Sequence, residues 1–473
     1  MDAKEFQTFG HKVVDLLSEY FESIEGKPVF PNADPKFING LFEEPLPDTP
    51  ENFEEVLQEL REKLLPYCTH VGHPGYMGLI TPSPNPVGVI GDFICSALNQ
   101  NLGVYSIGPS AVAMERQTIR WLADLAGYGK HAGGNLTSGG MMANFIALKL
   151  ARDWASKDRA QHEGVRQQWA VYGSEERHVS VDKAVDAVGL GRDAYRAIPT
   201  DAKFRVSIDA LELAIERDKS AGIRPMCIVG MFGTTNTGAV DDIRALRQIA
   251  DREGMWLHAD AAYGGGMLLS RDFALRGAGL KLADSITIDP HKWFYAPLDA
   301  GAVLVKDELR LTASFGMKPA YLTDEMEGAK ERYQYYVHGF EQSRRFRSLK
   351  VWMSFKRYGA RQIGEWIDNN VRQAQHLYAL VKDDTEFEAA SDPPMSAICI
   401  RYKPVREADA AKLHAEVAER VEKSGKFWIG TTELKGRMWF RINPVNFRTR
   451  QEHMEQLLDL LRLECREVSK VRV

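Results

Sequence analysis

The sequence predicts an α/β protein with a mostly parallel central sheet in a large domain, an N-terminal helical arm and a small α+β C-terminal domain. Between residues 86 and 355, near-continuous apolar runs alternate with amphipathic segments, which is typical of a sheet covered by helices on both faces. A chain of 473 residues also exceeds the size of one hydrophobic core. We therefore expect three segments, with the boundaries 1–85, 86–355 and 356–473.

The N-terminal segment predicts a helix with one apolar stripe. Apolar residues recur there at helical spacing, at Phe6, Phe9, Val13, Leu16, Leu17 and Tyr20. Either a membrane surface or another subunit could cover such a stripe. The polar face is mixed in charge rather than basic, which favours an arm packed on another subunit. Residues 26–50 are rich in proline and predict a connector, and residues 51–65 predict a helix that stops before Pro66.

The large domain contains five apolar runs that predict strands, at residues 169–172, 226–232, 255–259, 285–288 and 302–305. Amphipathic segments between them, such as 241–253, predict helices. In a sheet of this kind a ligand binds at the carboxyl ends of the strands. The smaller domain is predicted from helices and short strands at 362–382, 397–402, 409–424 and 438–442.

Charge and composition exclude several classes of protein. The net charge of −5 gives no electrostatic reason to bind nucleic acid or an anionic membrane. No apolar run approaches the roughly 20 residues that span a bilayer, and the first residues lack the regions of a signal peptide. Five scattered cysteines without metal-type spacing fit reduced thiols. We expect a cytoplasmic protein without a metal site.

Two successive predicted strands end in residues that suit pyridoxal phosphate (PLP) chemistry. Lys292 follows the strand at 285–288, and Asp260 ends the strand at 255–259. Burial favours the uncharged amine, which is the nucleophile toward an aldehyde. The lysine would bind the cofactor covalently, and the acid would keep the pyridine nitrogen protonated. The separation of 32 residues (292 − 260) allows one helix-and-strand unit, although Asp260 could instead cap a turn.

Three further segments could complete such a site, and two of them lie at the ends of predicted strands. The run Gly133–Gly140 precedes a helix that begins near Met141. Glycines at a helix N-terminus suit a phosphate, although a loop with a serine cap explains the run equally well. His178 lies just past a strand, where its imidazole either stacks on a cofactor ring or lies exposed. Thr235 places a hydroxyl at the end of the longest strand, in a site or in an ordinary turn.

A long polar segment, residues 321–343, has no clear periodicity and contains Tyr333, Tyr335, Tyr336 and His338. Such a segment is either a lid or a disordered surface loop. A lid tyrosine could donate a proton to a carbanion carbon. Surface aromatic residues that assist dimer packing are the alternative.

Seven markers in one order make the chain resemble the group II PLP-dependent amino-acid decarboxylases, and among them the aromatic-L-amino-acid decarboxylases. The resemblance covers nearly the whole chain. Its markers are His73-Pro74, Thr137-Ser138-Gly139-Gly140 with Ala143-Asn144, His178-Val179-Ser180, Gly233-Thr234-Thr235, the segment 258–263, Pro290-His291-Lys292-Trp293 and the segment 344–350. It implies fold type I of the PLP enzymes and a homodimer with sites at the subunit interface.

The resemblance also implies roles for individual residues. Lys292 would hold the cofactor, Asp260 would hold its pyridine nitrogen, and His178 would stack on its ring. Further cofactor contacts are implied at Gly139, Gly140, Met141, Thr235, Asp289 and His291. Two of these positions depart from the family pattern, because many relatives have a serine in place of Met141 and an asparagine in place of Asp289.

The proton donor and the substrate pocket are implied in the same way. Tyr335, counted back from the Arg344 marker, matches the proton donor of the family's mobile loop, and Tyr333 and Tyr336 are close to it. The pocket for the substrate side chain would be apolar and formed by Tyr76, Leu79, Ile80 and Tyr105. The segments around these four residues contain no arginine or lysine to pair with a distal carboxylate.

We therefore expect PLP-dependent decarboxylation of L-amino acids to amines and CO2, most of all of tryptophan, tyrosine, phenylalanine or dopa. One alternative is an aromatic aldehyde synthase on the same scaffold, which the presence of His178 and a loop tyrosine disfavours. A decarboxylase of glutamate or another acidic amino acid is a second alternative. A PLP-binding protein without activity is a third, and the presence of Lys292, Asp260 and a loop tyrosine argues against it.

Overall fold

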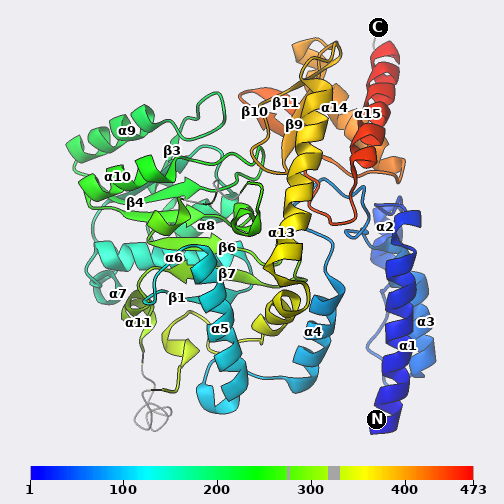
Figure 1. The fold of residues 1–473 in the computed structure, drawn as a ribbon, viewed down its shortest axis with the longest axis horizontal. Helices are drawn as coiled ribbons and strands as arrows, with labels where there is room; N and C mark the ends of the chain where they lie inside the picture. Colours follow the sequence, from blue (N-terminus) through cyan, green and yellow to red (C-terminus); the bar gives the residue numbers. More distant parts are fainter. Residues whose placement is uncertain (1, 274–276, 278, 318–330, 472–473) are drawn as a thin grey trace. The chain divides into compact units, whose positions relative to one another are not determined.

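The computed structural model describes residues 2–273, 277, 279–317 and 331–471. Figure 1 shows the helices and strands of the chain. The chain divides into two compact units. Unit 1 contains residues 1–79, 375–390 and 399–473, and unit 2 contains residues 80–374 and 391–398. The three predicted segments do not map one to one onto these units, because both ends of the chain belong to unit 1.

Unit 2 is built on a seven-stranded sheet in the order β1-β7-β6-β5-β4-β2-β3. Its strands are β1 Gly133–Thr137, β2 Trp169–Ser174, β3 Tyr195–Ile198, β4 Arg224–Met231, β5 Trp256–Asp260, β6 Ser285–Ile288 and β7 Gly301–Val305. The ladders from β3 through β2, β4 and β5 to β6 are parallel, while β7 runs antiparallel to both β6 and β1. The predicted mostly parallel sheet is confirmed.

Helices cover this sheet, and α6 (Gly140–Ala155) packs on β4, β5, β6 and β7. Ile146 and Leu150 of α6 lie in one apolar core with Val171 of β2. Other helices in the described part of unit 2 include α4 Pro86–Leu98, α5 Pro109–Leu125, α7 Ala160–Glu163, α8 Val179–Ala187, α9 Ile208–Ser220, α10 Ile243–Glu253 and α11 Leu309–Phe315. Because the parallel strands end at one edge, the helix starts and the loops that follow them meet there.

Two strands of the sheet lie outside the predicted set, β1 and β3. The glycine-rich start of β1 predicted only a loop before a helix. In the structure, a Cβ atom on Gly134 would lie 2.3 Å from the carbonyl oxygen of Val303 on β7. The glycine is therefore required for close pairing of two strands, which is one of the positions where a glycine belongs in a strand.

Unit 1 contains the predicted N-terminal helix, α1 Ala3–Glu22, which starts with a capping box formed by Asp2 and Glu5. The ring of Phe9 stacks on Phe53 of α3 (Phe53–Glu59) with centroids 4.1 Å apart. Part of the apolar stripe thus has a partner within the chain. Phe6 and Val14 of the same helix are about half exposed.

The rest of unit 1 is built on a four-stranded sheet in the order β10-β11-β9-β8. Its further elements are α2 Pro35–Gly40, β8 Phe387–Ala389, β9 Ile398–Tyr402, α14 Glu407–Lys423, β10 Gly430–Leu434, β11 Arg437–Ile442 and α15 Gln451–Val471. The predicted helix at 362–382 is the second part of α13 (Ser348–Val381), which is interrupted at Gly359. Within the described parts of the chain, no helix has both the length and the apolar character needed to cross a membrane.

Candidate functional site

A cavity of about 270 Å³ in unit 2 lies at the carboxyl ends of the parallel strands. It brings together every residue that we predicted as a cofactor contact: Gly139, Gly140, Met141, His178, Thr235, Asp260, Asp289, His291 and Lys292. Asp260 ends β5 and Lys292 follows β6, and these two strands are paired in parallel. The adjacency expected from their spacing in the sequence is confirmed. The described connection between the strands contains short 3-10 helices.

One wall of the cavity is the N-terminus of α6. Gly139 precedes this helix, and no side chain caps it. The first backbone N–H groups of a helix have no partner within the helix, and the helix dipole adds positive potential there. A bound phosphate would satisfy these groups, so the wall fits the phosphate of PLP.

The Asp260 carboxylate is buried, and both of its oxygens accept hydrogen bonds. Oδ2 accepts from Asn144 Nδ2 at 2.8 Å, and Oδ1 accepts from the backbone N–H of Ala262 at 3.1 Å. Asn144 Nδ2 also donates to Ser180 Oγ at 2.9 Å. Hydrogen bonds that favour the ionised form keep a buried carboxylate charged. This chemistry suits a group that pairs with a protonated ring nitrogen.

A chain of buried polar groups supports Asn144 from behind. Asn144 Oδ1 accepts from Thr287 Oγ1 at 2.7 Å and lies 3.0 Å from His258 Nε2. His258 Nδ1 lies 2.9 Å from Ser285 Oγ, which in turn accepts from Trp256 Nε1 at 2.9 Å. This pattern assigns the proton of His258 to Nε2. The positions of Asn144 and His258 were visible only as family markers, and no pattern in the sequence predicted that they touch.

Burial lowers the pKa of His258 to about 4, against the opposing effect of the nearby Asp260 carboxylate. The imidazole is therefore neutral at neutral pH. A neutral ring can donate to Asn144 through Nε2 while it accepts at Nδ1, which a doubly protonated ring cannot do. The network thus fixes the Asn144 amide in the orientation in which Nδ2 donates to Asp260 and to Ser180.

His178 is the N-cap residue of α8, and its Nδ1 accepts from the backbone N–H of Ser180 at 3.2 Å. Burial lowers the pKa of this imidazole, and the Asp260 carboxylate acts in the opposite direction. The ring lines the cavity rather than an open loop. The arrangement leaves Nε2 as the nitrogen that can face a ligand.

Lys292 forms an ion pair with Asp289, the third residue before it. Its Nζ lies 3.1 Å from Asp289 Oδ2, and His291 Nε2 lies 3.5 Å from the same oxygen. The lysine side chain is 23% exposed, whereas the aspartate is almost completely buried. The amine was expected in a buried position, and the structure instead gives it partial access to solvent and a carboxylate partner.

Tyr335 is not among the described residues that line this cavity. It begins a short 3-10 helix, Tyr335–Val337, and is buried in an apolar cluster with Leu102, Val112 and Phe346. The guanidinium of Arg344 lies 4.1 Å from the centroid of its ring. Burial raises the pKa of Tyr335 well above its ordinary value, so the phenol is protonated at neutral pH. Of the predicted lid, residues 321–330 lie outside the described residues.

The four residues predicted for the substrate pocket are divided between the two units. In unit 1, Tyr76 is buried and its ring stacks on Trp428 with centroids 5.0 Å apart, and Leu79 is half exposed. In unit 2, the backbone N–H of Tyr105 donates to Gln334 Oε1 at 2.9 Å, and Ile80 is partly buried. None of the four is among the described residues lining the cavity of Lys292.

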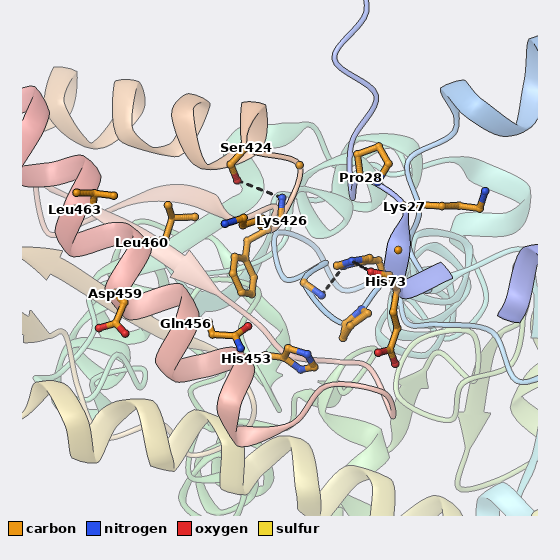
Figure 2. A pocket seen from close by; sticks show the side chains of 16 residues that line it. Lys27, Pro28, His73, Ser424, Lys426, His453, Gln456, Asp459, Leu460 and Leu463 are labelled. Atoms are coloured by element: carbon orange, nitrogen blue, oxygen red, sulfur yellow. Dashed lines mark hydrogen bonds between the residues drawn. The ribbon is translucent and has the colours of Figure 1, made fainter. Parts of the chain in front are cut away.

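Unit 1 contains a larger groove of about 870 Å³. Figure 2 shows that His453, Gln456, Asp459 and Leu460 of α15 line one side of it, opposite Lys27 and Pro28. Its glutamine and aspartate side chains are exposed. Among its described lining residues there is no pair of a lysine and a buried carboxylate. We therefore assign the chemistry to the smaller cavity, where the predicted residues converge.

Comparison with known proteins agrees with this assignment. The family model described as "Pyridoxal-dependent decarboxylase conserved domain" matches residues 35–403. The aromatic-L-amino-acid decarboxylase of Bacillus atrophaeus is 32% identical over 99% of this chain and 97% of its own length. The phenylacetaldehyde synthase of Arabidopsis thaliana is 28% identical over 98% of this chain and 96% of its own. The crystal structure of Oryza sativa TDC with PLP and tryptamine superposes with a TM-score of 0.92, at 29% identity over 99% of each chain.

Proposed function

Because this chain belongs to the pyridoxal-dependent decarboxylase family, a family of PLP-dependent carboxy-lyases, we propose that it decarboxylates aromatic L-amino acids to the corresponding amines and CO2. The proposal depends above all on the convergence of Lys292, Asp260 and His178 on one cavity at the strand ends. Aromatic-amino-acid decarboxylases that match nearly the whole chain support the aromatic substrate class.

The residues of the cavity fit PLP at each of its polar ends. The uncapped N-terminus of α6, with Gly139, Gly140 and Met141, would hold the phosphate together with His291. Lys292 would hold the cofactor covalently, and Thr235 would contact the ring. When bound, PLP supplies a conjugated ring that accepts the electron pair left behind when CO2 departs.

Asp260 would hold a proton on the pyridine nitrogen. Its two hydrogen bonds, from Asn144 and from the backbone of Ala262, fix the position of the carboxylate on the cavity wall. The network behind Asn144 means that this orientation needs no rearrangement during the reaction, which is the main requirement for electrostatic stabilisation. His178 would stack on the ring and contact the substrate carboxylate.

We propose a homodimer whose sites need residues from both subunits. Apolar side chains of α4 in unit 2 are exposed in the single chain: Ile90, Phe93, Ile94 and Leu98. Exposed apolar groups of this size on one helix face mark an interaction surface. The substrate pocket of Tyr76, Leu79, Ile80 and Tyr105 would then be completed at the interface.

For the proton that replaces CO2 on Cα, we propose Tyr335 as the donor. Its phenol is protonated at neutral pH, as a donor must be. Because it does not line the cavity of its own chain, donation requires that its segment reaches a cavity after a rearrangement or in the partner subunit. Tyr335→Phe should divert product from amine to aldehyde, whereas the neighbouring Tyr333→Phe should not. An unchanged amine yield in Tyr335→Phe would assign the proton to another group.

Product analysis tests the function and its alternatives together. The purified protein with PLP is incubated with a mixture of aromatic and acidic L-amino acids. Amine and CO2 from tryptophan, tyrosine, phenylalanine or dopa support the proposal. Aldehyde with peroxide would identify an aldehyde synthase, which the similarity to phenylacetaldehyde synthases makes the first alternative. Turnover of glutamate alone would assign the acidic substrate class.

The proposed function also suggests where the protein acts and what it binds. We propose that it acts in the cytoplasm on a small-molecule substrate, without a nucleic acid or membrane partner. The five cysteines are free thiols in the structure, and Cys95, Cys227, Cys399 and Cys465 are buried. Free thiols fit a reducing compartment.

A further inference from the structure

Asp289 has a buried carboxylate, and only one of its two oxygens has a partner among the described residues. It is 2% exposed. Its Oδ2 lies 3.1 Å from Lys292 Nζ, while Oδ1 has no hydrogen-bond partner among the described residues. A buried charged oxygen without a partner is costly. The arrangement therefore points to a group that enters the cavity, or to a change in the charge of the carboxylate.

The carboxylate lies against the wall that fits a phosphate. A Cβ atom on Gly140, the first residue of α6, would lie 2.8 Å from Asp289 Oδ2. A Cβ atom on Gly301 would lie 2.8 Å from Oδ1. Both oxygens thus face backbone that only glycine allows to come so close. A phosphate bound at the start of α6 would meet a carboxylate of the same sign, and two like charges cannot both remain ionised at close range without a large penalty.

The groups around Asp289 leave one source for a compensating proton. The titratable side chains that interact with it are Lys292 and His291 of its own loop and His178 at the start of α8, and Asp260 at the end of β5 lines the same cavity. Burial lowers the pKa of both histidines, so they are neutral at neutral pH. Both oxygens of Asp260 act as hydrogen-bond acceptors. The Lys292 ammonium is therefore the only nearby group among these four that carries a proton it can give up.

We propose that Asp289 is a positioning residue that accepts the proton of the Lys292 ammonium when PLP enters the cavity. One N–H bond of the ammonium breaks, its electron pair remains on Nζ, and the proton bonds to a carboxylate oxygen of Asp289. Lys292 becomes the neutral amine, whose Nζ could bond to the aldehyde carbon of PLP, and the aldehyde oxygen would leave as water with the two protons that remain on Nζ. Asp289 becomes a neutral carboxylic acid whose O–H can donate to a phosphate oxygen. A carboxylic acid kept neutral in a protein site to act as a donor is an established device.

This inference rests on the proposed PLP site. The number of protons released when PLP binds tests the inference separately from the proposed function. In the wild type, the lysine proton stays inside the protein when PLP binds. In Asp289→Asn the amide has no capacity to accept it, so the proton must leave to solvent. We expect Asp289→Asn apoprotein to release about one proton more per bound PLP than the wild type at pH 7. The measurement is calorimetric titration with PLP in buffers of different ionisation enthalpy.

A matched control distinguishes this effect from a general change of charge. Asp242 is exposed and caps α10 by accepting from the backbone N–H groups of Arg244 and Ala245. Asparagine caps a helix equally well, so Asp242→Asn removes one negative charge outside the cavity without loss of the cap. Its proton release should equal that of the wild type. Equal proton release by Asp289→Asn and the wild type would overturn the inference.

A second pair of variants tests the same proton transfer by removing its donor, Lys292. In Lys292→Ala the internal source is absent, so PLP that binds without a covalent link should cause uptake of about one proton from solvent. The double variant Lys292→Ala/Asp289→Asn should take up none. If the two variants take up the same number of protons, Asp289 does not accept one. Failure of the wild-type protein to bind PLP would instead overturn the proposed function.

The hydrogen bond to the phosphate has its own readout. An amide can replace the carboxylic acid as a donor, but a methyl group cannot. Asp289→Asn should therefore keep the preference for PLP over pyridoxal, and Asp289→Ala should lose about tenfold of it. Equal preference in the two variants would remove the phosphate contact from the proposal. Thermal unfolding of each apoprotein checks that the variants are folded.

Discussion

Asp260 and Asp289 are two buried carboxylates on one cavity, and their surroundings differ. Both oxygens of Asp260 accept hydrogen bonds, and a second layer of polar groups fixes the amide that supplies one of them. Asp289 has one oxygen beside a lysine and one oxygen without a partner among the described residues. A satisfied carboxylate keeps its charge, whereas an unsatisfied one gains by accepting a proton. The same residue type can therefore supply a permanent charge at one end of a ligand and a movable proton at the other.

The largest loss of turnover should follow from removal of Lys292, the residue that Asp289 contacts. Lys292→Ala should lower turnover by about 10⁴-fold or more, because it removes the covalent link to the cofactor on which the other groups depend. The variant protein should also lack the visible absorption band of lysine-bound PLP. Retention of that band, trapped by borohydride on a different lysine, would contradict the assignment of Lys292.

Removal of the permanent charge should have the next largest effect. Asp260→Asn should lower kcat by about 10²- to 10³-fold, because the neutral amide cannot hold a proton on the pyridine nitrogen. In Asp289→Asn, which leaves Asp260 in place, kcat should fall less than in Asp260→Asn. Steady-state kinetics of the two variants measures this difference. The two ends of the cavity would not differ as described if Asp289→Asn gave the larger loss of kcat.

The layer behind Asp260 should make stability depend on pH. The pKa of His258 is about 4 in the folded protein, and the ordinary value of an unfolded histidine is about 6.5. The unfolded chain therefore binds a proton first as the pH falls. The free energy of unfolding should fall by up to roughly 3 kcal/mol from this group between about pH 6.5 and pH 4, and not change further below that range.

Denaturant unfolding at several pH values, with His258→Gln as the comparison, isolates this contribution. The variant is expected to be less stable at pH 7, because its amide cannot reproduce both hydrogen bonds of the imidazole. It should also lose most of the dependence on pH between 4 and 6.5. A variant with the same slope as the wild type would show that other groups govern this range.

The smallest effect should come from a change at Met141, at the end of the cavity that would hold the phosphate. Met141 is the second residue of α6, and its side chain is partly exposed. Met141→Ser adds a hydroxyl donor beside the uncapped helix start, so the apoprotein should bind PLP about 2- to 10-fold more tightly. Fluorescence titration measures the change, and Met141→Ala serves as the control without a hydroxyl. A weaker affinity in the serine variant would mean that the phosphate does not lie near this residue.

The approximate place of the site could be predicted from residue patterns because it depends on local order along the chain. Apolar runs identified strands, and the residues after them identified the edge where a ligand binds. In this way Lys292, Asp260, His178 and Thr235 were expected at one edge of the sheet, and they line one cavity. Strand β1 was missed because its glycines resemble a loop, and only the partner strand β7 explains why no side chain fits there.

Long-range contacts lay beyond the sequence, because they depend on which groups a folded chain brings within a few ångströms of each other. Nothing in the order of residues indicated that Asn144 would lie between His258 and Asp260. The same holds for Tyr335: its segment was expected to be a lid or a surface loop, and the structure buries the residue against Arg344. By itself, the sequence determined the class of chemistry and the strand ends that provide it. Only the tertiary structure decided which of the two carboxylates is satisfied, because hydrogen bonds to buried groups come from elements far apart in the chain.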